Sequence, residues 1–324
     1  MTVKKSFFRT TPGVLKESFL EFIGDNVLKL SAALAYYTIF SLPSMLIVII
    51  GLCSIFYGKD AVQGEVFFQI DEYVGAQAAL DIQHMLQNTT LKHDNFLATA
   101  LGLITLLVAA TGMFGEIQDS INTIWGLKAK PKTGILKLIL NRLLSFSMVI
   151  VMGFILLVSL LLSALLESFF KQLRKHFSEE LINSLVVIDH ILMFGIIVLL
   201  FAFIFKALPD AKVKWRDVWR GALVTAILFL LGKMVIGYYL DHNSMISAYG
   251  AAGSLIGVLL WVYYSAMILY FGAEFTQVYV RHQGRRIEPN KYAVWVEKNI
   301  VEKKYNTDIE EKVKTIDNKI EPKI

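Results

Sequence analysis

Six long apolar stretches, separated by shorter polar segments, dominate the pattern of hydrophobic and polar positions along the chain. A helix needs about 20 predominantly apolar residues to cross the hydrocarbon core of a bilayer, and each stretch is long enough. The pattern therefore predicts an all-α, polytopic membrane protein with six transmembrane helices. The predicted spans are residues 30–56, 96–115, 138–166, 185–205, 221–240 and 250–275.

The distribution of lysine and arginine predicts the orientation of these spans. The segments before the first span, after the second and after the fourth are strongly basic, whereas residues 57–95 carry only Lys59 and Lys92 among six acidic residues. Basic segments mark the cytoplasmic side of a membrane protein. With an even number of spans, both termini are predicted to be cytoplasmic.

The segments outside the spans have patterns of their own. Residues 1–29 are predicted to form a cytoplasmic segment with an interfacial amphipathic helix, because apolar residues recur there at helical spacing. Residues 57–95 show similar spacing in two stretches, which predicts an outer loop made of two short helices. Residues 30–280 form the predicted transmembrane domain. Residues 281–324 form a charged cytoplasmic tail, and its composition beyond about residue 306 predicts disorder.

Composition supports the membrane class and narrows the chemistry. Hydrophobic residues make up 55% of the chain and charged residues 18%, which is too apolar for a soluble protein of 324 residues. The net charge of +5 follows from the topology, so no nucleic-acid partner is expected. Membrane lipids are the expected partners, and a second copy of the chain or an envelope protein stays an open alternative.

Lys233 is the outstanding polar residue within the predicted spans. A charge at the centre of a membrane helix costs at least about 2.5 kcal/mol on insertion scales, so such residues are the first candidates for function. Lys233 follows Arg220 by 13 residues, which places it about 20 Å into a core of about 30 Å. Asp189 and His190 of the fourth span are predicted to lie at a depth from which their side chains could reach the Lys233 ammonium group. The alternative is that Lys233 simply extends its ammonium group to the outer surface.

The first span adds a second irregular feature to this candidate substrate path. Pro43 lies at its middle, where the missing backbone N–H interrupts the helical hydrogen bonds and predicts a kink. The candidate substrate path comprises Lys233, Asp189, His190, Pro43, Tyr36 and Tyr37.

A second polar group lies at the predicted cytoplasmic ends of the second and sixth spans. It comprises Glu116, Asp119, Asn122 and Glu274. The spacing of Glu116 and Asp119 places both carboxylates on one helical face. Two interpretations stay open: pairing with the basic loops around Arg142 and Arg216, or proton coupling by a carboxylate inside the membrane.

Small residues within the spans predict close helix packing. The pair Gly253 and Gly257 has the spacing that lets two membrane helices approach. Gly112 and Gly115 are the corresponding candidates in the second span.

Signatures of enzymes are missing from the sequence. The six histidines are scattered, and Cys53 is the single cysteine, so no metal-ligand cluster is visible. There is no phosphate-binding glycine loop and no Gly-x-Ser-x-Gly motif. We therefore expect neither catalytic residues nor a cofactor or metal, and no enzymatic activity.

Four separate segments are recognisable as a set. They are Ser31-Ala-Ala-Leu-Ala-Tyr-Tyr-Thr-Ile-Phe-Ser-Leu-Pro43, Thr111-Gly-Met-Phe-Gly-Glu-Ile-Gln-Asp-Ser-Ile-Asn-Thr-Ile-Trp-Gly126, Leu208-Pro-Asp-Ala-Lys-Val-Lys-Trp-Arg-Asp217 with Leu231-Gly-Lys233, and Tyr249-Gly-Ala-Ala-Gly-Ser-Leu-Ile-Gly-Val-Leu-Leu-Trp-Val-Tyr-Tyr-Ser265 with Phe271-Gly-Ala-Glu-Phe275. In this order they resemble the YihY/BrkB family of bacterial inner-membrane proteins. The likeness covers nearly all residues up to about 282.

The resemblance implies six helices, cytoplasmic termini and a place in the bacterial plasma (inner) membrane. The family has carried a ribonuclease label, but an RNA hydrolase needs metal ligands or an acid/base pair, and neither is visible here. Links of the family to virulence and to lipid precursors of the envelope imply transport or flipping of a lipid-like, amphiphilic substrate as the leading function. A proton-coupled or ion carrier is the second hypothesis, and a scaffold for envelope assembly is the third.

Overall fold

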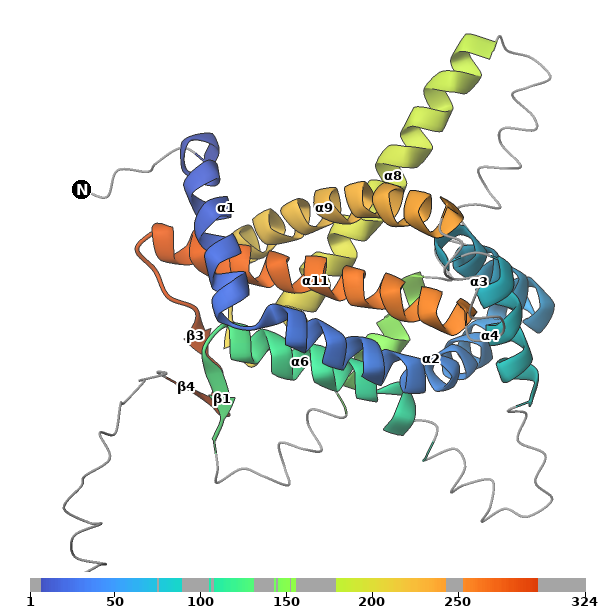
Figure 1. Ribbon diagram of the computed structural model, residues 1–324, viewed down its shortest axis with the longest axis horizontal. Coiled ribbons are helices and arrows are strands. Elements are labelled where there is room, and N and C mark those ends of the chain that lie inside the picture. The colour runs from blue at the N-terminus through green and yellow to red at the C-terminus, as the bar shows by residue number, and fades with distance from the viewer. Residues whose placement is uncertain are drawn as a thin grey trace, which may run out of the picture.

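A computed structural model of the chain describes residues 7–74, 76–88, 105, 108–130, 143, 145–151, 153–155, 179–242 and 253–296. Most of this part is helical (Figure 1). The helices are α1 (Phe7–Gly24), α2 (Val27–Tyr57), α3 (Lys59–Val74), α4 (Ala76–Asn88), α6 (Gly112–Ile124), α8 (Glu179–Ala207), α9 (Trp215–His242) and α11 (Gly253–His282). The strands are β1 (Leu127–Ala129), β2 (Ala211–Lys212), β3 (Glu288–Pro289) and β4 (Ala293–Trp295).

Three described helices are long and apolar enough to cross a membrane: Val27–Phe56 in α2, Trp215–Tyr238 in α9 and Gly253–His282 in α11. They contain the predicted first and fifth spans and most of the sixth. The predicted fourth span falls within α8, whose part Ile191–Ala207 is a shorter apolar helix. The predicted spans 96–115 and 138–166 lie largely outside the described residues. The helical membrane class is confirmed, and the count of six spans stays a prediction.

The long helices α2, α9 and α11 and the shorter α6 pack side by side, and the remaining elements gather at the two ends of this bundle (Figure 1). At one end, α3 and α4 pack against each other and against α2 and α11. We call this the cap end. The prediction of two short helices between the first and second spans is confirmed by α3 and α4.

The four strands lie at the opposite end, which we call the strand end (Figure 1). β1 pairs antiparallel with β4, with Leu127 opposite Trp295, and β2 pairs antiparallel with β3, with Lys212 opposite Glu288. The chain segments that follow α6, α8 and α11 therefore meet in space. α1 lies at the same end and runs steeply across the long helices (Figure 1).

α9 and α11 run antiparallel and interlock through one glycine and one threonine on each helix. A Cβ atom on Gly221 would lie 1.9 Å from Thr276 Oγ1, and one on Gly272 would lie 1.8 Å from Thr225 Oγ1. Each threonine hydroxyl donates to the carbonyl of the glycine one turn earlier in its own helix, at 2.7 Å. Because small residues let membrane helices approach closely, this crossing fixes the register of α9 against α11.

α2 packs against both α6 and α11. Pro43 lies inside α2, which continues as one helix from Val27 to Tyr57. A Cβ atom on Gly112 of α6 would lie 2.9 Å from the Ser41 hydroxyl oxygen of α2. At Gly112, for which a packing role is predicted, α6 and α2 approach each other closely. The contact on α2 is Ser41, two residues before Pro43.

Candidate functional site

Buried polar side chains line the region where α2, α6 and α11 pack against one another. We call this set the polar seam. Its members are Ser31, Thr38 and Ser41 on α2, Gln118 and Ser120 on α6, and Tyr270 and Glu274 on α11. Since polar groups inside a membrane protein are costly, a concentration of them in the packed interior is a candidate functional site.

Glu116 and Tyr270 meet in the polar seam through Ser120. The Ser120 hydroxyl lies 3.4 Å from Glu116 Oε1, and the buried Tyr270 hydroxyl lies against Ser120. The charges of Glu116 and Asp119 are close enough to act on Tyr270 electrostatically. Asp119 itself is exposed. Of the two carboxylates, Glu116 is half-buried and lies beside Ser120, whereas Asp119 is exposed to the outside of the packed helices.

Glu274 lies one helical turn beyond Tyr270 on α11 and is fully buried. Next to it, the Trp125 indole N–H donates to the Ala273 carbonyl at 3.0 Å, which fixes the end of α6 against α11 at this level. The sequence places Glu274 at the end of the sixth span beside Arg281. In the structure Arg281 lies two turns further on and binds carboxylates of α1. Glu274 belongs instead to the interior of the bundle.

Lys233 is half-buried and lies on the inward side of α9. It shares helical spacing with the buried residues Ala226 and Ile236. The preceding residue, Gly232, is covered by α11, because a Cβ atom there would lie 2.2 Å from the ring of Tyr264. On either side of Lys233, Leu231 and Met234 are 56% and 73% exposed. Lys233 thus lies at the border between helix packing and the apolar surface.

Two other predicted members of the substrate path, Tyr36 and Tyr37, lie at a different depth from Lys233. Tyr36 and Tyr37 are 61% and 46% exposed on α2, where Tyr36 packs against Phe40 with ring centroids 4.9 Å apart. Helical rise places Tyr36 about 14 Å from the start of α2, whereas Lys233 is about 27 Å from the start of α9. The side chains of Asp189 and His190 lie outside the part of α8 that is described.

An ion pair between a buried carboxylate and a partly exposed arginine joins the start of α9 to the segment after α11. Asp217 is 1% exposed and accepts two hydrogen bonds from Arg285, at 2.6 and 2.8 Å. Arg220 approaches the same carboxylate at 3.8 Å and lies over the ring of Tyr279. The hydrogen bonds to Asp217 raise the pKa of the Arg285 guanidinium above its ordinary value. Such bidentate charged pairs hold two segments in one geometry.

Asn122 takes part in a second polar contact at the strand end. Its amide N–H donates to the Asp210 carboxylate at 3.0 Å, and its carbonyl oxygen accepts from the Asp210 backbone N–H at 2.8 Å. Asn290 donates its backbone N–H to the Asp210 carbonyl at 2.8 Å. Asn122 therefore joins α6 to the loop after α8 and to the segment after α11, rather than to Glu116 or Glu274.

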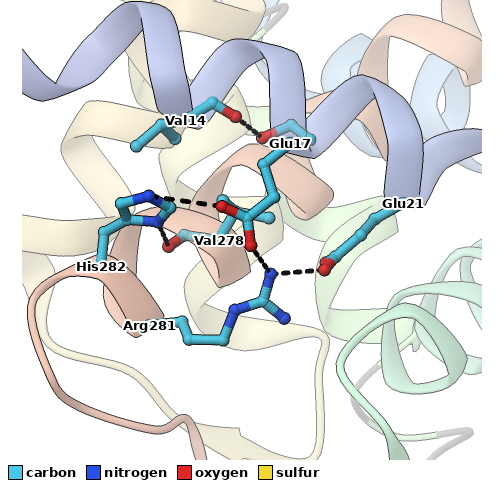
Figure 2. Close-up of polar contacts among 7 residues, drawn as sticks. Val14, Glu17, Glu21, Val278, Arg281 and His282 are labelled. Atoms are coloured by element: carbon cyan, nitrogen blue, oxygen red, sulfur yellow. Dashed lines mark hydrogen bonds and ion pairs between the residues drawn. The ribbon is translucent and has the colours of Figure 1, made fainter.

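A third contact attaches α1 to the end of α11. Figure 2 shows the Glu17 carboxylate between Arg281 and His282, with Glu21 on the far side of Arg281. The His282 Nε2 atom lies 3.3 Å from Glu17 Oε2, and its Nδ1 lies 3.1 Å from the Val278 carbonyl oxygen. These side chains are all partly exposed, whereas the Asp217 carboxylate is buried.

The glycines predicted to pack behave differently from one another. Gly112 approaches α2, as described above, and Gly253 and Gly257 are buried on α11. A Cβ atom on Gly115 would meet no described atom within 4 Å. The tightest crossing instead uses Gly221 and Gly272, which the sequence analysis did not single out. The Gly-x-x-x-Thr spacing at residues 221–225 and 272–276 is the sequence pattern from which this crossing could have been predicted.

The strand-end residues Asp217, Arg285 and Asp210 were likewise not identified from sequence. Asp217 lies in a strongly basic segment, and its partner is 68 positions away. The described residues contain no group of three or more His, Cys, Asp or Glu side chains that could hold a metal ion.

Comparison with known proteins places this chain in a family. The sequence model of the family described as Virulence factor BrkB matches residues 18–294. A UPF0761 membrane protein of Alteromonas mediterranea is 28% identical over 279 residues, covering 84% of this chain and 90% of that protein. The UPF0761 membrane protein of Pseudoalteromonas translucida is 26% identical, and the match covers 84% of this chain and 87% of that protein. The one of Tolumonas auensis is 30% identical, and the match covers 55% of this chain and 56% of that protein. No solved structure matches the chain.

Long apolar helices that enclose a polar seam define a multi-pass α-helical protein of the bacterial inner membrane. Within this class, the chain belongs to the virulence factor BrkB family. The resemblance carried by the four sequence segments is confirmed.

Proposed function

We propose that the chain crosses the inner membrane six times, with both termini in the cytoplasm, and moves a lipid-like or amphiphilic envelope substrate. The strand pairing supports the topology. β1 follows the predicted second span and β4 follows the sixth, so their pairing supports an arrangement in which both spans end on the same side of the membrane. β2, which follows the fourth span, pairs with β3 on that side too. The lysines and arginines of these segments make it the cytoplasmic side.

The position of Lys233 carries the proposal of substrate movement. Its side chain starts from the inward side of α9 and is flanked by the exposed apolar residues Leu231 and Met234. A cation at this border, in the outer half of the membrane, can be reached by the headgroup of a lipid in the surrounding bilayer. Ammonium groups bind phosphate and carboxylate oxygens as point charges. The substrate that fits is therefore an amphiphile with an anionic headgroup.

The test compares Lys233→Leu, Lys233→Arg and Met234→Leu in reconstituted vesicles. The transfer between leaflets of a headgroup-labelled anionic lipid and of its neutral counterpart is measured with an outside quencher. We expect Lys233→Leu to lose transfer of the anionic lipid, and the other two variants to keep it. Normal anionic transfer by Lys233→Leu, at equal amounts of folded protein, would contradict the proposal.

A proton-coupled carrier is the second candidate, and the buried Glu274 favours it. A fully buried carboxylate on a membrane-spanning helix, one turn from Tyr270, has the surroundings in which protonation couples to movement. Proton flux into sealed vesicles, followed with an internal pH-sensitive dye, would test this. We expect Glu274→Gln to abolish flux, and Asp119→Asn, which changes an exposed carboxylate, to leave it unchanged. Flux in Glu274→Gln equal to that of the unmodified protein would exclude this role.

A further inference from the structure

Two tryptophans form an exposed aromatic surface at the first turn of α9. Trp215 and Trp219 are 51% and 43% exposed and lie four residues apart, so their rings share one helical face. The same face continues through Leu223 and Ile227, which are 39% and 45% exposed. An apolar stripe that ends in tryptophans is typical of a helix that leaves the hydrocarbon core at the level of the lipid headgroups.

The exposed charges around these tryptophans are positive. Lys214 and Arg216 are exposed on either side of Trp215. The acidic residue of this turn, Asp217, is 1% exposed and is turned inward to Arg285. Lys212 lies opposite Glu288 in the β2–β3 pair. The outward surface is therefore formed by Lys214, Trp215, Arg216 and Trp219, and it carries two exposed positive charges.

The backbone and the first ring of this surface are held in place by Lys206. Its ammonium group donates to the Val213 carbonyl oxygen at 2.5 Å and lies 5.7 Å from the centre of the Trp215 ring. Val213 itself is buried. The surface is thus fixed before any ligand arrives, which lowers the entropic cost of binding.

We propose that Lys214, Trp215, Arg216 and Trp219 form a binding site for the phosphate headgroup of an anionic phospholipid in the leaflet at the strand end. The guanidinium and ammonium groups suit the phosphate, and the tryptophan rings suit the interface and the upper acyl chain. Charge complementarity identifies the occupant as a lipid in a bilayer, because the basic groups adjoin the apolar stripe of α9. Arg216 lies 17 residues before Lys233, about 26 Å along the helix, so this site is independent of the proposed substrate path.

Tryptophan fluorescence of the full chain in mixed micelles tests the site. Phosphatidylglycerol with brominated acyl chains quenches tryptophans that it contacts, and brominated phosphatidylcholine serves as the neutral lipid. Each basic residue near an anionic surface is worth roughly a fivefold change in affinity, so K214Q/R216Q should weaken the phosphatidylglycerol titration roughly 25-fold. K128Q/K130Q is the matched control, since it removes two exposed charges from the same end and should keep the original affinity. W215F/W219F should lose the quenched signal.

The outcomes separate the alternatives. Unchanged affinity in K214Q/R216Q would overturn the proposal, and so would an equal loss in K128Q/K130Q, which would indicate only a general field. Equal competition by soluble glycerol phosphate or by a short RNA would assign the surface to a free phosphate or to nucleic acid instead. R216K retains the charge and should retain binding. Unchanged thermal unfolding of K214Q/R216Q, together with an unchanged phosphatidylcholine titration, would exclude misfolding as the cause.

Discussion

The two ends of the helical bundle are held together by different forces. At the strand end, the ion pair of the buried Asp217 with Arg285 and the reciprocal hydrogen bonds of Asn122 and Asp210 join segments that follow three different helices. At the cap end, α3 and α4 meet across a small, mainly apolar cleft that is lined by residues such as Val66, Ile70 and Ile82. A hydrogen bond from Ser254 to Asp81 joins α4 to the first turn of α11.

This difference indicates which end can rearrange at lower cost. Separating the strand end would leave a buried charge without its partner, and such a step costs several kcal/mol. Displacing α4 from α11 exposes apolar surface gradually and gives up a partly buried hydrogen bond. We therefore expect the strand end to act as a fixed frame and the cap end to open first. The predictions below test this contrast, beginning with the largest expected effect.

The Asp217→Ala substitution should have the largest effect. It removes two charge-assisted hydrogen bonds from Arg285, which is partly exposed, so we expect a loss of about 2–3 kcal/mol in the free energy of unfolding. Thermal or denaturant unfolding in detergent measures it. Asp60→Asn, which changes an exposed carboxylate at the start of α3, serves as the control and should have little effect. A loss below about 1 kcal/mol for Asp217→Ala would remove the basis for a fixed frame.

The next largest effect should come from Gly221→Ala. The new methyl group would collide with Thr276 Oγ1, and overpacking of this kind costs about 1–3 kcal/mol. Gly237→Ala on the same helix is the control near the cap end, because a Cβ atom there meets no described atom within 4 Å. It should be neutral or slightly stabilising, since alanine has the higher helix propensity. Equal destabilisation by both variants would contradict the interlocked crossing.

At the cap end, Ser254→Ala should produce a local effect. The loss of one hydrogen bond to Asp81 should cost about 1 kcal/mol. Hydrogen exchange would detect it as faster exchange in α3 and α4, with little change at the strands. Gln69→Ala breaks a hydrogen bond that lies within α3 alone, so it should leave the exchange of α4 unchanged. Faster exchange of the strand-end amides in Ser254→Ala would contradict the separation of the two ends.

The smallest effect is expected where α1 contacts α11. Glu17→Gln combined with Glu21→Gln removes an ion pair between partly exposed side chains, which is worth about 0–1 kcal/mol. The loss should shrink further at high salt, because exposed charges are screened. Unfolding of the variant and of the unmodified protein at two salt concentrations measures both the loss in free energy and its dependence on salt. A loss as large as that of Asp217→Ala would make α1 part of the fixed frame.

The sequence predicted the features that depend on local pattern. Runs of apolar residues located α2, α9 and α11, and helical spacing located α1 and the pair α3 and α4. The sequence could not reveal the strands, since three-residue segments such as Leu127–Ala129 lack a recognisable alternation and form only by pairing with distant residues.

The candidate site was predicted in part from the sequence, because only some of its features depend on local pattern. Lys233 and Glu274 attracted attention because charges are rare in apolar spans. Their surroundings, such as the cover of Tyr264 over Gly232, depend on helix packing that one sequence does not encode locally. Asp217 looked like one more charge in a basic loop, and only its partner Arg285 explains its burial. Tyr36 and Tyr37 were assigned to the path, and in the structure both side chains are exposed on α2.

The pairing of β1 with β4 also constrains the order in which the protein can be assembled. β1 cannot pair until Trp295 of β4 has been synthesised, and about half of the chain is synthesised between Leu127 and Trp295. During that interval the helices enter the membrane one after another while the segment at residue 127 has no strand beside it. Closure of the strand end is therefore a late event of biogenesis, and a ribosome that stalls before residue 293 would leave helices whose ends at the strand end are not yet joined.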